Sequence, residues 1–444
     1  MGLTGLEIYK QLPKKNCGEC GPPTCLAFAM ALASGKASLD SCPYVSDEAK
    51  ENLDAASAPP IKLVKVGTGD AEIELGDETE LFRHDKTFYH PTGVGFLVSD
   101  KLSTDEINAK VEEINSLEFE RVGLEYKVDF VVVKCDSGDA GTYKAAVEAV
   151  VAKSKQAFIL YCEDAGILEQ ALAVVADKKP LIYPATENNH EAMTKLAKDN
   201  SVPLGVKGND LNSLAELVQK ISKEYKELVI DSGNRETSQT LEDLVQMRRQ
   251  AIKKKFRPFG YPIMVFATEG DSLDQALQAQ VYVSKYASIT VIDTTNRADV
   301  LALLTWRQNI YTDPQKPIQV EEKVYEVGEV TPDSPVYLTT NFSLTYYSVE
   351  GEVEASKIPS YIIPIDTDGT SVLTAWAAGK YEGDKISETL KRLGIEEKVN
   401  HRNIVIPGYV AVISGKLNEA SGWNVIVGPR EASGIPAFAK SQFS

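Results

Sequence analysis

Residues 130–162 read FVVVKCDSGDAGTYKAAVEAVVAKSKQAFILYC and contain one complete unit of a repeat that runs through the middle of the chain. A short apolar run, FVVVKC, precedes a helix-length amphipathic segment, and a second apolar run, FILYC, follows it. Short buried strands that alternate with helices are typical of a parallel sheet, because each crossover helix returns the chain to the same end of the sheet.

The same unit recurs on both sides of this stretch. The eight apolar runs are GFLVSD (95–100), FVVVKC (130–135), FILYC (158–162), LIYP (181–184), PLGVKG (203–208), LVIDSG (228–233), IMVFAT (263–268) and ITVID (289–293). Eight strand–helix units within about 215 residues predict a closed TIM (β/α)₈ barrel. In front of them, IKLVKVGTGDAEIELG (61–76) has two alternating runs around a Thr-Gly-Asp turn and predicts a β-hairpin.

A second α/β pattern follows the barrel. Its four apolar runs are PVYLTT (335–340), YIIPID (361–366), NIVIPGY (403–409) and NVIVGP (424–429). They predict a small open Rossmann-like or flavodoxin-like sheet. Residues 311–334 are rich in Pro and Glu without a helical period and predict a linker that contains one short strand.

Cysteines set the N-terminal segment apart, and the stretch DAASAPP (54–60) ends it as a linker. The sequence therefore predicts four parts: a cysteine domain in residues 1–57, a barrel with its hairpin in 58–310, a linker in 311–334 and an α/β domain in 335–444. The predicted fold class is α/β, with a small cysteine domain in front.

Charge and hydropathy exclude several classes of function. The 444-residue chain has a formal net charge of -17, so most of its surface would repel nucleic acid. One dense basic run, between Arg248 and Arg257, falls at the end of a predicted helix, where cations complement the helix dipole or form a local docking patch. No stretch approaches the roughly 20 apolar residues that span a bilayer, and no signal peptide is recognisable. We expect a cytoplasmic protein without a membrane or nucleic-acid partner.

Four of the six cysteines follow the spacing C-x2-C-x4-C-x16-C: Cys17, Cys20, Cys25 and Cys42. Four thiolates are the usual ligands of a [4Fe–4S] cluster. Cys17 and Cys20 lie in a glycine-containing loop, and Cys25 falls in the first turn of a predicted helix, whose dipole favours a thiolate. A structural zinc site is the alternative, although zinc sites usually have a second closely spaced pair.

The remaining candidate metal ligands show no such spacing. Cys135 and Cys162 both end predicted barrel strands, where we expect them to be buried thiols. The four histidines, His84, His90, His190 and His401, are scattered along the chain, and we expect them to be surface or packing residues.

The ends of the C-terminal strands carry small polar residues, as in TTNFSLTYYSVEG (339–351) and DTDGTSVLTAWAAGK (366–380). Ligands of open α/β sheets collect beyond the carboxyl ends of the strands, and helix N-termini expected at Ser343, Ser371 and Glu431 would add N–H donors there. Because neither G-x-G-x-x-G nor G-x-x-x-x-G-K-[ST] occurs, a dinucleotide or NTP site is disfavoured. These residues alone leave two interpretations open, a cofactor domain of unknown ligand and a dimerisation domain.

The chain resembles the family of corrinoid/iron–sulfur protein large subunits. The resemblance covers all three segments in order and is strongest in NCGECGPPTC (16–25) with Cys42, in TTNFSLTYY (339–347), in DGTSVLTAWAAGK (368–380) and in GYVAVISGKLNEASGWNVIVGPREASGIP (408–436). The cysteine motif is shared with other redox proteins, so its pairing with this C-terminal domain is the more specific feature.

The resemblance implies a methyl carrier of the anaerobic acetyl-CoA pathway. The C-terminal domain would hold a cobamide whose cobalt takes a methyl group from methyltetrahydrofolate through a separate methyltransferase and passes it to acetyl-CoA synthase. The cluster would return Co(II) to Co(I) after accidental oxidation. The implied partners are a small subunit that forms a heterodimer with this chain, the methyltransferase, acetyl-CoA synthase and a reductive activator.

The implied cobamide contacts lie at the strand ends. Ser371, Val372, Leu373 and Thr374 would lie under the corrin face, and other residues would line its edge. The full set is Thr340, Asn341, Ser343, Thr345, Gly369, Thr370, Ser371, Val372, Leu373, Thr374, Gly408, Ala432, Ser433 and Gly434. No D-x-H-x-x-G motif occurs, and His401 precedes a strand, so we expect a base-off cobamide without a histidine ligand.

Two other functions remain open at this point. Asp100, Asp231 and Asp293 end predicted barrel strands, where barrel enzymes place their active sites, and could bind a pterin in a barrel methyltransferase. Alternatively, the chain is an electron-transfer subunit whose C-terminal domain serves assembly. The resemblance instead favours a barrel that docks a partner subunit and the corrinoid domain.

Overall fold

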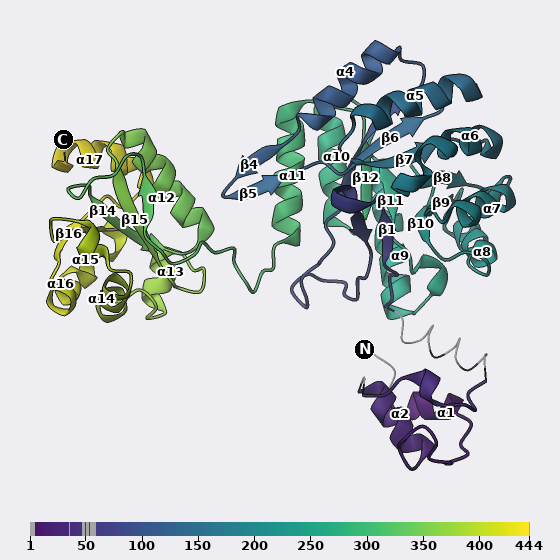
Figure 1. The fold of residues 1–444 in the computed structure, drawn as a ribbon, viewed down its shortest axis with the longest axis horizontal. Helices are drawn as coiled ribbons and strands as arrows, with labels where there is room; N and C mark the ends of the chain where they lie inside the picture. The colour runs from purple at the N-terminus through teal and green to yellow at the C-terminus, as the bar shows by residue number, and fades with distance from the viewer. Residues whose placement is uncertain (1–4, 35, 47–48, 50–52, 54–58, 444) are drawn as a thin grey trace.

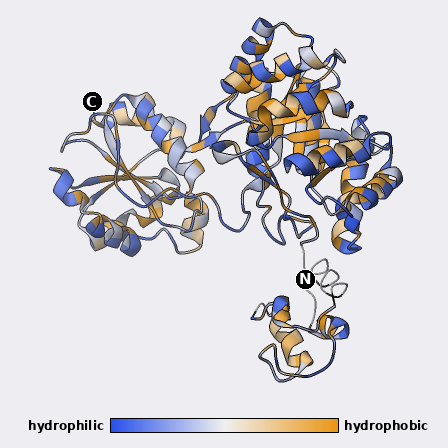
Figure 2. Cartoon of the chain, turned by 45° about the vertical axis from the view of Figure 1, so that its right-hand side comes forward, coloured by the Kyte–Doolittle hydropathy of each residue, from blue (hydrophilic) through white to orange (hydrophobic). Residues whose placement is uncertain are grey.

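The computed structural model describes residues 5–34, 36–46, 49, 53 and 59–443 of the chain. A small helical domain, a barrel and an α/β domain follow one another from the N-terminus to the C-terminus (Figure 1). Most of the linker predicted at residues 54–60 lies outside the described residues. Apolar residues concentrate in the strands at the centre of the barrel and of the C-terminal sheet (Figure 2). No helix in the described ranges combines the length and the apolarity that a membrane span requires.

Eight parallel strands form the barrel, as the repeat predicts. They are β3 (Gly93–Ser99), β6 (Phe130–Lys134), β7 (Ala157–Tyr161), β8 (Leu181–Ala185), β9 (Leu204–Lys207), β10 (Leu228–Asp231), β11 (Met264–Phe266) and β12 (Ile289–Ile292). The hydrogen-bonded order is β10-β9-β8-β7-β6-β3-β12-β11, and a parallel bridge between Ile230 and Ile263 closes the ring.

Each barrel strand leads into a helix of the outer coat. These helices are α4 (Thr104–Asn115), α5 (Ala140–Lys153), α6 (Ala165–Val175), α7 (His190–Asn200), α8 (Leu211–Ile221), α9 (Thr237–Lys253), α10 (Ser272–Ser284) and α11 (Arg297–Tyr311). Each buries an apolar face against the strands; in α8, for example, Leu214, Leu217, Val218 and Ile221 are buried. The amphipathic pattern of the sequence therefore corresponds to helices that pack their apolar faces on the barrel.

The predicted hairpin closes the barrel at the amino ends of its strands. It consists of the antiparallel strands β1 (Val64–Val66) and β2 (Ile73–Leu75). Val64, Val66 and Leu75 pack in one buried cluster with side chains of the barrel interior, including Phe130 and Leu181. The amide of Gly67 donates to the carbonyl of Lys179 (2.9 Å), which fixes the hairpin to the start of β8.

A second hairpin, β4 (Phe119–Arg121) and β5 (Leu124–Tyr126), was not expected from the sequence. Its turn residues Val122 and Gly123 both have positive φ, 55° and 68°. A Cβ on Gly123 would lie 1.8 Å from the hydroxyl of Tyr347 in the C-terminal domain, so only glycine allows this close approach. The segment is too short and too charged for its alternation to stand out.

The C-terminal sheet has the order β13-β15-β14-β16-β17. Four strands are parallel: β14 (Val336–Thr340), β15 (Ser360–Ile365), β16 (Asn403–Ile406) and β17 (Asn424–Val427); β13 (Tyr325–Val327) pairs antiparallel with β15. The helices are α12 (Ser343–Ser356), α13 (Val372–Ala377), α14 (Gly383–Arg392), α15 (Ile395–Lys398), α16 (Ser414–Ser421) and α17 (Ile435–Phe443). Buried clusters on both faces of the sheet give a flavodoxin-like three-layer domain.

The linker between the barrel and this domain is shorter than the predicted range of 311–334. Helix α11 extends through Tyr311, the carbonyl of Ile318 accepts from the amide of Ser343, and β13 belongs to the C-terminal sheet. Only residues 312–317 remain between the two. Strand β13 joins the edge of the sheet through backbone hydrogen bonds alone. Its pairing therefore requires no apolar pattern that could be recognised in the sequence.

Candidate cofactor sites

The N-terminal domain arranges its cysteines around helix α2 (Cys25–Ala33), which packs against α1 (Gly5–Gln11). Thr24 caps α2 by accepting from the amide of Ala27 at 3.1 Å. The amide of Cys25 donates to Oδ1 of Asn16 (2.8 Å), and the amide of Asn16 donates to Sγ of Cys25 (3.4 Å). The predicted position of Cys25 in the first turn is therefore confirmed, and a backbone donor faces its sulfur.

The other three cysteines lie in the loop before α2 and in the segment after it. Gly18 and Gly21 have φ of 77° and 98°, a backbone conformation that lets the loop turn around Cys20. Cys25 and Cys42 belong to one buried cluster of this domain, and Cys20 packs against it; burial raises the pKa of Cys20. Cys25 and Cys42 are buried and Cys17 is exposed.

This donor set suits an iron–sulfur cluster. Cys20, Cys25 and Cys42 pack in one cluster, Cys17 lies in the same glycine-containing loop as Cys20, and thiolates with nearby N–H groups are what such a cluster requires. Within the described residues, no three His, Cys, Asp or Glu side chains form a group that could hold a single metal ion.

The C-terminal domain has a cavity of about 380 Å³ between the ends of β14 and β16. Here the strand order reverses, which is where flavodoxin-like sheets bind their ligands. Five predicted residues line it: Thr345, Ser371, Val372, Leu373 and Ala432. Its deeper wall is apolar, with side chains that include Leu338, Val349, Ile406 and Ile435.

The other predicted residues lie around this cavity without lining it. Thr340 ends β14, Asn341 follows it, and Ser343 begins α12. Thr374 is in the first turn of α13, with its hydroxyl 3.1 Å from that of Ser371. The remaining five are backbone or turn positions at the same edge: Gly369, Thr370, Gly408, Ser433 and Gly434.

Asn341 is fully engaged by the chain itself. Its Oδ1 accepts from the amides of Thr367 (2.9 Å) and Gly369 (3.1 Å), and its Nδ2 donates to Asp366 (2.9 Å) and Gln319 (3.0 Å). We conclude that Asn341 holds the loop from β15 to α13 in place. It acts on the edge of the cavity through that loop.

Polar groups near the cavity lack partners in the described structure. The buried hydroxyls of Tyr337, Thr339 and Thr340 make no hydrogen bond within it, and burial raises the pKa of Tyr337 to about 12. Helices α12 and α13 begin without a side-chain cap; the first amide of α12, that of Ser343, donates to the carbonyl of Ile318, and no side chain caps the amides that follow. Unpaired buried polar groups are rare and call for an explanation, which a bound ligand would supply.

Large apolar side chains surround the opening. Leu344 and Leu373 line the cavity and are 49% and 46% exposed. Trp376 in α13 and Val412 after β16 do not line it, and they are 41% and 73% exposed. Tyr409, also exposed, donates to Glu431 across the opening. The sequence did not predict four of these residues: Leu344, Trp376, Tyr409 and Val412. The one sequence feature that could have indicated them is their position after strand ends, among small polar residues. An apolar rim of this kind fits a large, flat ligand.

His401 lies at the opposite end of the sheet, before β16. Its Nε2 contacts the carbonyl of Ser334 (3.0 Å), and its Nδ1 accepts from the amide of Asn403 (3.1 Å). Both ring nitrogens therefore have backbone partners. This agrees with the prediction that His401 is a packing residue.

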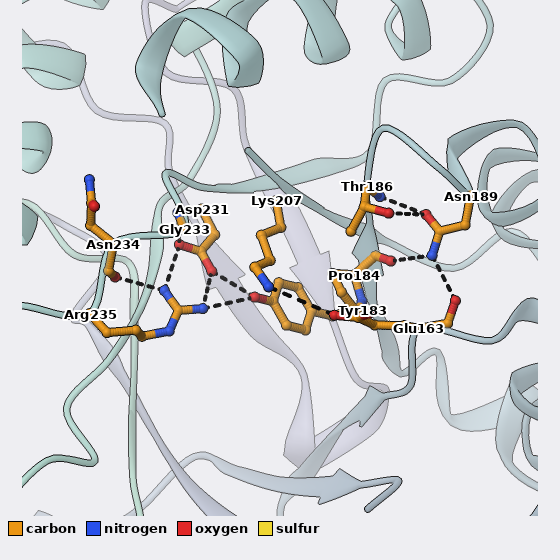
Figure 3. A network of polar contacts seen from close by, with 10 residues as sticks. All are labelled: Glu163, Tyr183, Pro184, Thr186, Asn189, Lys207, Asp231, Gly233, Asn234 and Arg235. Atoms are coloured by element: carbon orange, nitrogen blue, oxygen red, sulfur yellow. Dashed lines mark hydrogen bonds and ion pairs between the residues drawn. The ribbon is translucent and has the colours of Figure 1, made fainter. Parts of the chain in front are cut away.

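The carboxyl ends of the barrel strands are arranged differently (Figure 3). Asp231, 2% exposed, accepts from the hydroxyl of Tyr183 (2.7 Å), the amide of Gly233 (2.8 Å) and Arg235 (2.9 Å). Burial opposes the charge of Arg235, but Asp231 outweighs it and raises the pKa of the guanidinium. Arg235 also lies over the ring of Phe266, 4.4 Å from its centroid.

The other two aspartates also have partners within the chain. Asp100 accepts from the amides of Asp136 and Ser137, both at 2.9 Å, and Asp293 forms an ion pair with Lys110 at 2.6 Å. Cys135 and Cys162 follow adjacent strands, and burial raises the pKa of both, to about 12 for Cys162. Cys162 is buried, as predicted, whereas Cys135 is only partly buried.

Comparison with known proteins finds two matching family models. The family model for the CO dehydrogenase/acetyl-CoA synthase delta subunit matches residues 63–439, and a model described as a putative Fe–S cluster matches residues 12–44. Among solved structures, the chain is similar to dihydropteroate synthase from Thermus thermophilus, with 13% identity and a TM-score of 0.39 over 55% of this chain and 98% of that one.

Similarity extends over the full chain in two relatives. The chain is 59% identical over 445 residues to the corrinoid/iron–sulfur protein large subunit of Moorella thermoacetica, and the alignment covers 100% of both chains. It is 37% identical over 454 residues to the acetyl-CoA decarbonylase/synthase complex subunit gamma of Methanopyrus kandleri, covering 99% of this chain and 98% of that one. The chain therefore belongs to the family of corrinoid/iron–sulfur protein large subunits of the acetyl-CoA pathway.

Proposed function

We propose that this chain is a methyl carrier with two cofactors, a [4Fe–4S] cluster and a base-off cobamide. The methyl group would come from methyltetrahydrofolate through a separate methyltransferase and go to acetyl-CoA synthase, and electrons from the cluster would return oxidised cobalt to Co(I). The relatives are named as a corrinoid/iron–sulfur protein and as a complex subunit, which supports both cofactors and a small-subunit partner in a heterodimer. A reductive activator and a cytoplasmic location complete the proposal.

The observation that carries the proposal is the cavity at the reversal of the C-terminal sheet. It combines an apolar wall, unpaired hydroxyls and uncapped helix N-termini with an apolar rim. A corrin has an apolar ring face and amide groups around its edge. We infer that Leu373 and Thr374 contact the ring, while Thr345, Ser371 and the turn at Ala432–Gly434 meet its edge.

The same cavity has room for the lower base of the cofactor. In a base-off cobamide, the aromatic base is released from cobalt and must be placed elsewhere. The apolar wall formed by Leu338, Val349, Ile406 and Ile435 suits a flat aromatic group. The side chains of this chain would thus bind both the ring and its base, and leave the other ring face open to partner proteins.

A pterin-dependent barrel methyltransferase is the competing function. It would need free polar groups at the barrel mouth, but Asp100, Asp231 and Asp293 are each engaged by neighbouring groups. Methyl transfer from methyltetrahydrofolate by this chain alone would favour that function over a carrier.

An anaerobic absorption spectrum with cobalt and iron quantified together tests the proposal. We expect about one cobalt and about four irons per chain, with base-off corrinoid bands. Iron without cobalt, even after reconstitution with cobamide, would exclude the carrier and leave an electron-transfer subunit. Zinc in place of iron would exclude the cluster.

A further inference from the structure

The basic run at the end of α9 separates into two groups in the structure. Arg248 is buried, pairs with Glu78 (3.2 Å) and lies over the ring of Tyr286. Arg257 donates to the carbonyl of Pro59 (3.2 Å). These two cations therefore hold the fold together, whereas the lysines between them are exposed.

Lysines from two helices gather at this place. Lys253 ends α9 and Lys254 and Lys255 follow it. Lys220 lies in the last turn of α8 and Lys223 just after that helix. All five are exposed, and η4 (Arg257–Phe259) packs against both helices. We call these five residues the basic patch. None of the five forms an ion pair within the described residues, although the chain has 64 acidic residues.

The ends of other barrel helices carry fewer lysines than the basic patch. Lys153, the last residue of α5, has an acidic partner at 2.6 Å, whereas α7 and α10 each end with one lysine, Lys198 and Lys285. The helix dipole explains a cation at a helix end but not five unpaired ones. The carboxylates nearest in sequence are Glu216, Glu224 and Glu227, and Glu227 is already paired with Lys62 (2.5 Å). Positive charge therefore predominates at this site.

Next to the basic patch, η4 holds the point where the chain enters the barrel from the cysteine domain. Arg257 holds Pro59, and the amide of Lys62 donates to the carbonyl of Gly260 (2.9 Å). Figure 1 shows the cysteine domain on the same side of the barrel as the end of α9. A protein bound at the basic patch would thus be near the cluster that the four cysteines are proposed to hold.

We propose that the basic patch is the docking surface for a small acidic redox protein that reduces the cluster. The inference rests on the proposed function, in which the cluster needs an external electron for each cobalt that it restores. One electron leaves the donor and enters the cluster, and no bond or proton changes. With a net charge of -17, the rest of the chain repels an acidic donor, so steering directs it to the basic patch.

The test measures reduction of the cluster in the full, cofactor-loaded protein. The probe is an acidic bacterial ferredoxin that is reduced beforehand and then mixed with the protein at about 20 mM or about 300 mM salt. Surface charges interact over a long range at the lower concentration and are strongly screened at the higher one. The variant is Lys253→Glu/Lys254→Glu, and the matched control is Lys357→Glu/Lys391→Glu on the C-terminal domain. We expect the variant to react about 10-fold more slowly at low salt and to lose the salt dependence; the control should keep both.

Reduction by methyl viologen radical, a small donor that needs no docking surface, should be the same in all three proteins. An unchanged ferredoxin rate in the variant would overturn the proposal. The proposal would also be overturned if the variant changed both the solution scattering profile and the rate of reduction by viologen. That result would show that the basic patch binds the cysteine domain of its own chain. Failure of the proposed function is read separately, from the iron and cobalt content.

Discussion

The barrel and the C-terminal domain present the same structural feature, the carboxyl edge of a parallel sheet, in opposite states. At the barrel edge, Asp231 has four hydrogen bonds from Tyr183, Gly233 and Arg235. At the C-terminal edge, the hydroxyls of Thr339 and Thr340 have no partner within the described structure. Polar groups at the barrel edge bond to one another and stabilise the fold, whereas those at the C-terminal edge are unpaired and could bind a ligand.

Helix caps follow the same division. Ser103, Asp139, Asp164 and Asp210 cap barrel helices through their side chains, as do Glu236, Asp271 and Asn296 later in the ring. Among the described residues, α7 is the one barrel helix without such a cap, whereas α12, α13, α14, α15 and α16 all lack one. Most barrel helices are thus capped by the chain itself, and these C-terminal helices, including the two that face the cavity, are not.

The largest expected effect is on the barrel edge. Asp231→Ala leaves Arg235 and Tyr183 without their main partner in a buried site, so we expect a loss of about 3 kcal/mol in the free energy of unfolding, measured with urea. Asp293→Ala removes an exposed pair and should cost less than about 1 kcal/mol. Equal losses in the two variants, or a loss of cobamide from the Asp231 variant while it remains folded, would contradict the comparison.

The next effect concerns the apolar rim. Leu373→Glu places a charge where we propose that the corrin ring lies, and we expect cobamide to bind about 100-fold more weakly. Titration of the cobamide-free protein, followed by absorbance, measures this. Leu273→Glu, at a leucine that is also exposed but lies on α10, is the matched control and should bind as the unmodified protein does. Normal binding by the Leu373 variant would remove the rim from the site.

Unpaired hydroxyls give a smaller effect that can be compared across the two sheets. Thr339 in β14 and Thr290 in β12 are both buried without a hydrogen-bond partner in the described residues. If a ligand satisfies Thr339 only, Thr339→Val should weaken cobamide binding about 5-fold, a loss of about 1 kcal/mol. Thr290→Val should leave binding unchanged, and neither should lower the stability of the cobamide-free protein. Equal binding by both variants would show that Thr339 does not meet the ligand.

The smallest effect is the acid sensitivity of the barrel caps. Hydrogen bonds from the amides of Thr142 and Ser213 lower the pKa of Asp139 and Asp210, respectively. A lowered pKa stabilises the fold above the ordinary value of about 4, and this contribution is lost as the pH falls through the lowered pKa. Amide exchange at α5 and α8 should therefore speed up in acid. The double variant Asp139→Asn/Asp210→Asn should show a smaller acid-induced rise in amide exchange at α5 and α8, because asparagine caps a helix without titrating. Exchange at α12 should be the same in the variant and the unmodified protein.

Much of the fold could be predicted because it depends on local patterns. The eight barrel strands and the four parallel C-terminal strands fall within or next to their predicted runs, since a buried strand is apolar at consecutive positions. The hairpin at residues 119–126 and the pairing of β13 could not be predicted. Both depend on short, polar segments whose contacts, to Tyr347 and to β15, involve distant residues.

The candidate sites divide in the same way. Cys17, Cys20, Cys25 and Cys42 could be selected from spacing alone, because three of them lie within one loop and the start of one helix. In the C-terminal domain, resemblance and the rule for strand ends selected residues around the cavity. They did not distinguish those that line it, such as Leu373, from those that position a loop, such as Asn341.

The sequence by itself determined the order of the three domains, the positions of the parallel strands and the four-cysteine motif, because each is written in residues close together in the chain. Only the tertiary structure decided which strand ends are satisfied and which are open. Tyr183 reaches Asp231 across 48 residues, β14 lies beside β16 although β15 follows it in the chain, and lysines of α8 and α9 meet on one surface. Such contacts depend on how the chain closes on itself, which no local pattern records.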